Sequence, residues 1–99
     1  MLIAIDYDGT ISADIETFKE VIRVFQLFGH EVICVTYRSN EAGRDNSDMD
    51  WLKDFIDNIY FTDRVAKKKH LSEDCHLIPD IWIEDYPENI LFDLEDLPG

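Results

Sequence analysis

Two aspartates stand one residue apart directly after an apolar run, in the stretch LIAIDYDGT (2–10). Aspartate is unfavourable in strands and is rarely buried without a partner, so Asp6 and Asp8 need a compensating interaction. Two bare carboxylates about 4 Å apart repel each other by about 4 kcal/mol at an effective dielectric of about 20. A divalent cation would reverse that repulsion. Oxygen ligands without a nearby histidine or cysteine favour Mg²⁺.

Three further polar groups follow apolar runs later in the chain. Thr36 ends the second run, Lys67 comes soon after the third, and the pair Glu84-Asp85 ends the fourth. One carboxylate could attack phosphorus while a second moves a proton to or from the reacting oxygens. A hydroxyl and an ammonium could hold the phosphoryl oxygens as charge shifts in the transition state. The set therefore predicts phosphoryl transfer.

The elements that must position these groups alternate between strand and helix. Apolar runs of strand length predict strands at 2–6, 31–36, 59–62 and 81–84. Periodic apolar residues and a basic stretch predict helices at 15–28, 47–58, from within 64–71, and at 87–97. This alternation predicts an α/β fold, a Rossmann-like three-layer sandwich with a short parallel sheet. Right-handed crossovers would bring the carboxyl ends of all four strands, and their polar groups, to one edge.

Capping signals support three of the predicted helix ends. Asp14 is a plausible N-cap for the first helix, and Gly29 stands where a C-terminal glycine belongs. Pro87 suits the first position of the last helix.

Composition limits the class of protein. The chain has 99 residues, of which 45% are hydrophobic, and its net charge is −13. Ninety-nine residues suffice for one small domain. An acidic surface disfavours nonspecific nucleic-acid binding. Apolar runs are far shorter than the roughly 20 residues that span a bilayer, so no membrane association is expected. Cys34 and Cys75 belong to no CxxC pair, and we expect reduced thiols and a cytoplasmic protein.

The ordered set of DYDGT, a strand-terminal threonine, a downstream lysine and a strand-terminal acidic pair resembles the haloacid dehalogenase (HAD) superfamily. The resemblance covers residues 1–99 as one HAD-like core domain. It implies a Mg²⁺-dependent phosphatase that works through an aspartyl-phosphate intermediate. Response-regulator receivers use a similar aspartate and lysine set, but there the threonine follows a third acidic residue on a middle strand.

The resemblance implies a role for each matching residue. Asp6 would be the nucleophile and a Mg²⁺ ligand, and Asp8 would be the general acid/base with its main-chain carbonyl on the metal. Thr36 would bind the phosphoryl group, Lys67 would neutralise Asp6 and the phosphate, and Asp85 would ligate Mg²⁺.

The groups around these residues are predicted to contact the substrate. Gly9 and Thr10 would shape the turn after the first strand. Tyr37 and Arg38 follow Thr36 directly, and the Arg38 guanidinium suits a substrate phosphate, although a surface arginine explains it equally well. Glu84 stands where many members carry Asp or Gly, which leaves its role open.

The sequence is compatible with more than one assignment at two points of the site. Lys68 and Lys69 compete with Lys67 for the role of site lysine. A catalytically weak phosphate- or metal-binding partner module is the alternative to an enzyme, and transfer to an acceptor other than water is a third option.

Chain length between the motifs indicates an open site. Only 25 residues separate Thr10 from Thr36, and 30 separate Thr36 from Lys67, so neither gap has room for the cap domain that many members carry. We expect a phosphorylated substrate, either a small molecule or a macromolecular phosphate end. Nucleic acid is disfavoured by the charge, and a homo-oligomer could supply a lid.

Overall fold

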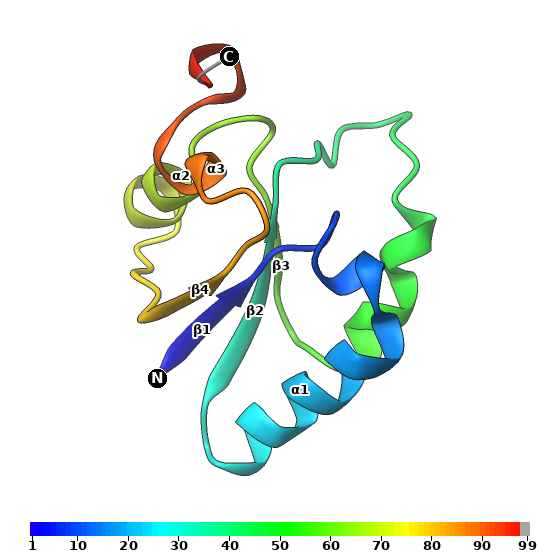
Figure 1. Ribbon diagram of the computed structural model, residues 1–99. Helices are drawn as coiled ribbons and strands as arrows, with labels where there is room; N and C mark the ends of the chain where they lie inside the picture. Colours follow the sequence, from blue (N-terminus) through cyan, green and yellow to red (C-terminus); the bar gives the residue numbers. More distant parts are fainter. Residues whose placement is uncertain (98–99) are drawn as a thin grey trace.

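Four parallel strands form the centre of the protein (Figure 1), whose structure is a computed structural model describing residues 1–97. They are β1 (Leu2–Ile5), β2 (Glu31–Thr36), β3 (Ile59–Phe61) and β4 (Ile81–Ile83). Their order is β3-β2-β1-β4, and every neighbouring pair is parallel. β1 therefore lies inside the sheet, with its carboxyl end between those of β2 and β4.

Helices cover both faces of this sheet (Figure 1). The α-helices are α1 (Ile15–Leu27), α2 (Lys67–Asp74) and α3 (Glu88–Leu91). Three 3₁₀ segments accompany them: η1 (Ile11–Ala13), η2 (Ser47–Asp54) and η3 (Leu94–Asp96). α1 and η2 pack on one face, while α2 and α3 lie on the other side of the sheet.

Alternating strand residues fill the two cores. Ile3 and Ile5 of β1 pack with Ile22 of α1, whereas Ala4 between them packs with Leu71 of α2. A strand buried on both faces reads as a continuous apolar run, which is why these strands were recognisable. The predicted Rossmann-like three-layer sandwich is confirmed, and residues 1–97 form no cap domain.

Most predicted boundaries agree with the structure to within one residue. All four strands and α1 do so, and β2 spans the predicted residues. The Asp14 side chain accepts a hydrogen bond from the Thr17 amide at 3.2 Å, which confirms the N-cap. Gly29 has φ +86° just after α1, the left-handed conformation that favours glycine.

The segment predicted as a helix over 47–58 is instead the shorter 3₁₀ helix η2. Its two buried side chains, Met49 and Leu52, are three residues apart. Residues at that spacing eclipse each other in a 3₁₀ helix and so share one face, which satisfies the core without an α-helix. The chain leaves the helix at Phe55, and Ile56 is buried from the following loop.

The third predicted helix agrees with the structure, whereas the last one does not. α2 begins at Lys67, within the predicted 64–71, and Asp63 and Arg64 just before it adopt left-handed backbone angles. The predicted helix over 87–97 is two pieces, α3 and η3, separated by extended backbone at Phe92. Pro87 precedes the first helical residue instead of occupying that position.

Tertiary hydrogen bonds account for the break after α3. The Tyr37 hydroxyl donates to the Phe92 carbonyl, and the Leu94 amide donates to the Arg64 carbonyl at 2.8 Å. These bonds tie backbone groups to the neighbouring loops, where a continuous helix would have used them internally.

Every helix within the described residues 1–97 is too short or too polar to traverse a lipid bilayer. Cys34 is buried in β2, Cys75 is half-buried after α2, and both are free thiols.

Candidate functional site

The carboxyl ends of β1 and β4 meet where the order of the strands reverses. β1 connects to β2 on one side, whereas β4 pairs with β1 on the other. The Asp6 amide extends this pairing by donating to the Ile83 carbonyl at 2.9 Å. Open α/β sheets bind ligands at such switch points because the loops diverge there. Asp6 follows β1 and Glu84-Asp85 follows β4, so the sheet brings these acids together.

A buried lysine contacts two of these carboxylates. Lys67 Nζ lies 2.7 Å from Asp6 Oδ1 and also pairs with Glu84 Oε1. Its side chain is only 1% exposed, and those of Asp6 and Glu84 are 7% and 2% exposed. An ammonium almost never enters a protein interior without such partners. The three side chains are therefore fixed relative to one another.

The position of Lys67 answers which lysine belongs to the site. It is the first residue of α2 and faces the sheet, whereas Lys68 and Lys69 are exposed. Successive residues of a helix point about 100° apart, so only one of three adjacent lysines can enter the site.

Thr10 contacts both Asp6 and Asp85, the latter 75 positions further along the chain. Its Oγ1 lies 3.1 Å from Asp6 Oδ2 and 3.2 Å from Asp85 Oδ1, and it accepts from the Asp85 amide at 3.2 Å. The hydroxyl has one proton and therefore donates to one carboxylate at a time. Gly9, at φ +79°, leaves no room for a Cβ, which would overlap the Asp85 carboxylate. A glycine is thus required both by the turn and by the neighbouring acid.

The acids of this region form what we call the sheet-edge triad, namely Asp6, Glu84 and Asp85, whose oxygens lie within 4.8 Å of one another. One ammonium faces three carboxylates. Burial raises the pKa of Asp6, and it raises that of Glu84 to about 7, in each case against the pull of Lys67. Burial also disfavours ionisation of Asp85, but side-chain hydrogen bonding shared with Asp6, Glu84 and Thr10 outweighs it and lowers the pKa of Asp85. The triad therefore lacks compensating positive charge.

The sheet-edge triad fits a small hard cation. It offers only oxygen ligands, which suits Mg²⁺. Asp6, Asp85 and Glu84 are the residues that could hold it. The fit rests on the donor atoms and on the uncompensated charge.

Thr36 and Tyr37 line the site from the end of β2. Thr36 is buried, and its Oγ1 accepts from the Arg38 amide at 3.2 Å, which leaves the hydroxyl proton for another acceptor. The Tyr37 ring centre lies 5.7 Å from Lys67 Nζ. The Tyr37 hydroxyl binds the Phe92 carbonyl, so its ring rather than its hydroxyl faces the lysine.

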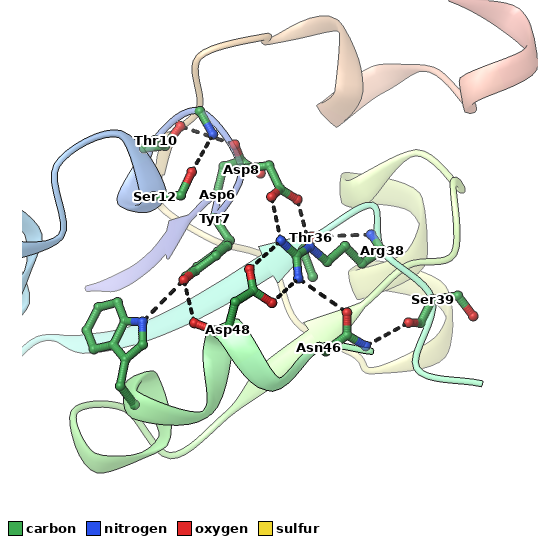
Figure 2. A network of polar contacts seen from close by, with 12 residues as sticks. Asp6, Tyr7, Asp8, Thr10, Ser12, Thr36, Arg38, Ser39, Asn46 and Asp48 are labelled. Atoms are coloured by element: carbon green, nitrogen blue, oxygen red, sulfur yellow. Dashed lines mark hydrogen bonds and ion pairs between the residues drawn. The ribbon is translucent and has the colours of Figure 1, made fainter. Parts of the chain in front are cut away.

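Asp8 does not join the sheet-edge triad. Its carboxylate turns towards Arg38, which binds both Asp8 oxygens at 2.9 and 2.7 Å (Figure 2). Arg38 also binds both oxygens of Asp48, at 2.7 and 2.8 Å. A hollow of about 440 Å³ opens beside this arginine and is also lined by Arg44 and Arg64. The predicted substrate residue Arg38 is thus placed between two carboxylates.

Two site residues were missed or left undefined by the sequence. Glu84 proves to be a buried partner of Lys67, a contact that only the pairing of β1 with β4 creates. Asp48 lies in a stretch of acidic and polar residues where nothing marks it as special.

A second acidic cluster, which we call the C-terminal triad, contains Asp93, Glu95 and Asp96.

Comparison with known proteins gives no relative: the chain matches no family model, no curated protein and no solved structure. The superfamily resemblance stays a prediction from the motifs. The function proposed below is supported by the geometry of the site.

Proposed function

We propose that the protein is a Mg²⁺-dependent phosphohydrolase that acts through an aspartyl-phosphate at Asp6. The observation that carries this proposal is the buried contact of Asp6 with Lys67. This ammonium is a single positive charge beside the three carboxylates of the sheet-edge triad. A nucleophilic carboxylate benefits from such partners, since the ammonium and a cation would also neutralise an incoming phosphate.

Mg²⁺ would be held by Asp6 and Asp85, with Glu84 beside them, and would supply positive charge to the phosphoryl oxygens and to the nucleophile. Lys67 would place a second positive charge next to Asp6. The Thr36 hydroxyl proton would donate to a phosphoryl oxygen. These groups stabilise the charge that develops as the phosphoryl group moves.

The reaction would run in two steps. An Asp6 oxygen attacks phosphorus, the bond to the leaving oxygen breaks, and Asp8, which enters this step protonated, gives that oxygen its proton and becomes a carboxylate. In the second step Asp8 takes a proton from water as the water attacks phosphorus. The bond between phosphorus and Asp6 then breaks, which releases inorganic phosphate and restores the aspartate.

A second candidate is a phosphate- or metal-binding partner module with weak or no catalysis. The contact between Lys67 and Glu84 favours it, because the carboxylate occupies the ammonium that a phosphate would use. Both candidates use the same site, and only turnover separates them.

We further propose a phosphorylated substrate that reaches an open site, because residues 1–97 supply no cap. The net charge of −13 disfavours a nucleic-acid substrate. A neighbouring copy of the chain could serve as a lid. The two free thiols support a cytoplasmic location.

Hydrolysis of an aryl phosphate with Mg²⁺, before and after Asp6→Asn, tests the enzyme proposal. The substitution keeps the side-chain shape but removes the nucleophile, so we expect activity to fall at least about 1,000-fold, in line with loss of a nucleophile. Asp96→Asn, at an exposed member of the C-terminal triad, is the matched control and should retain activity. Circular dichroism would verify folding of both variants. A folded wild type that is inert towards a broad panel of phosphate esters would instead favour the binding module.

A further inference from the structure

Arg38 has no hydrogen-bond donor left for a ligand. Its Nε and Nη2 bind Asp8, its Nη1 and Nη2 bind Asp48, and its Nη1 also reaches Asn46 Oδ1 at 3.4 Å. A guanidinium carries five N–H donors, and five contacts are made here. The guanidinium also lies over the Tyr7 ring, 5.3 Å from its centre. Any contact with a substrate would require Arg38 to leave one of its carboxylates.

The main chain of Asp48 is anchored to the core, while its side chain binds Arg38. Its main-chain carbonyl accepts from the Tyr7 hydroxyl at 2.9 Å, and the same hydroxyl accepts from Trp51 Nε1 at 3.2 Å (Figure 2). Tyr7 is 2% exposed, so this end cannot move without disturbing the core.

These contacts close a ring. Asp8 binds Arg38, Arg38 binds Asp48, Asp48 binds Tyr7, and Tyr7 is the covalent neighbour of Asp8. The Asp8 side chain is 56% exposed, and within residues 1–97 the ring supplies its only ion pair. A free aspartate at the surface would sample several rotamers. The ring instead holds one orientation.

We propose that Asp48 and Arg38 are positioning residues that hold the Asp8 carboxylate where it exchanges a proton with the leaving oxygen. This inference rests on the proposed phosphohydrolase function and assigns Asp48 a role in it. Arg38 acts through Asp8 and not by contact with the substrate phosphate. Misplacement of a reacting group by about 1 Å can lower a rate about 100-fold.

Two substrates with different leaving groups test the role. Loss of Asp8 orientation affects an alkyl phosphate, whose alkoxide needs a proton, more than an aryl phosphate, whose phenolate leaves unaided. In rapid-quench measurements of the first step, we expect Asp48→Ala to slow alkyl phosphate cleavage at least about tenfold. Aryl phosphate cleavage should change less than about threefold, and KM should stay the same for both. Asp48→Glu, which keeps both acceptor oxygens, should restore part of the alkyl rate.

A double variant shows whether Asp48 acts through Asp8. On an Asp8→Asn background, Asp48→Ala should have no further effect on the alkyl phosphate, because the group it positions is gone. Equal additional loss on that background would overturn the inference. A KM increase for both substrates would also overturn it, because it would mean that Arg38 binds the substrate. A faster alkyl rate in Asp48→Ala would overturn it too, because it would mean that the ring holds Asp8 away from the leaving oxygen.

Failure of the inference is distinguishable from failure of the proposed function. An active wild type whose Asp48→Ala variant keeps its full alkyl rate overturns the positioning role alone. A wild type inert towards both esters overturns both. Should Asp48→Ala unfold, Asp48→Asn keeps one acceptor oxygen for Arg38 and carries the same leaving-group comparison.

Discussion

The sheet-edge triad and the C-terminal triad each bring three carboxylates within 4.8 Å, yet they differ in every other respect. The first brings Asp6, just after β1, to Glu84 and Asp85, just after β4 and more than 75 positions away, and Lys67 and Thr10 contact these acids. The second lies within four consecutive residues around η3, and two of its three members are exposed.

Local geometry alone explains the C-terminal triad. Acidic residues favour the first turn of a helix, where unpaired amides and the helix dipole attract negative charge. Asp93 also accepts from the Ala66 amide at 2.8 Å, just before α2. Carboxylates that are close because they are sequence neighbours need no ligand, whereas burial of distant ones beside a lysine requires a cause. The comparison indicates that burial and long-range origin, more than proximity, mark a site.

The largest effect should come from removing the lysine that only the sheet-edge triad has. Lys67→Ala leaves Asp6 and Glu84 without a buried counter-charge, so we expect about 3–5 kcal/mol of destabilisation in urea unfolding. The proposed phosphatase activity should fall by about 100-fold or more, since the charge next to Asp6, the proposed nucleophile, is lost. Lys68→Ala, one residue further and exposed, is the control and should change stability by less than about 0.5 kcal/mol. Equal effects of the two substitutions would refute the assignment of Lys67.

Metal affinity separates the two triads directly. Asp85→Asn removes one ligand charge, and we expect Mg²⁺ affinity, measured by isothermal titration calorimetry, to fall at least about tenfold. Asp96→Asn removes the same charge from the C-terminal triad and should leave the affinity unchanged. If Asp96→Asn weakened binding as much as Asp85→Asn, exposed acids would bind as well as buried ones, and the comparison would fail.

The smallest effect is a pH dependence of stability without metal. The pKa of Glu84 is about 7 in the folded chain, against an ordinary value of 4.5. Between these values the folded state holds more protons than the unfolded state, so stability should decrease as pH rises through this window. Above pH 7 the folded state bears the full free-energy cost of ionising buried Glu84. Urea unfolding in a chelator at pH 5.5 and pH 8 should show the decrease.

Glu84→Gln serves as the comparison for that titration. The glutamine side chain cannot ionise, so the stability of this variant should fall less between the two pH values than that of the wild type. A wild type that is equally stable at both, or an unchanged slope in Glu84→Gln, would argue against a buried, proton-retaining Glu84. Adding Mg²⁺ should stabilise the wild type more at pH 8, where Glu84 is ionised.

Signals read within one segment predicted the fold well. The continuous apolar run of β2 and the Asp14 cap of α1 are local features, and the structure has both. The η2 segment was predicted as an α-helix because apolar residues every three or four positions suit both helix types. Only the packing of Met49 and Leu52 against the sheet decides between them.

The site was predictable where position along a strand decides it. Asp6 and Asp85 follow buried strands, and parallel topology then brings them to one edge. The contact partner of each site side chain was not predictable from the sequence, because it depends on distances across the fold. Arg38 could be placed near the site by its distance from Thr36, yet its saturation by Asp8 and Asp48 involves a loop residue with no distinguishing pattern.

The close packing of Gly9 against Asp85 affects how the protein folds during its synthesis. The turn after β1 closes against Asp85, so residues from the start of the chain find their neighbours only after β4 has been synthesised and has docked. Contacts over such separations form late and slowly in folding, because a long loop must close first. A nascent chain that has not yet produced β4 carries Asp6, the proposed nucleophile, without its acidic partners. The proposed reactivity towards phosphate esters would therefore appear only after β4 has been translated.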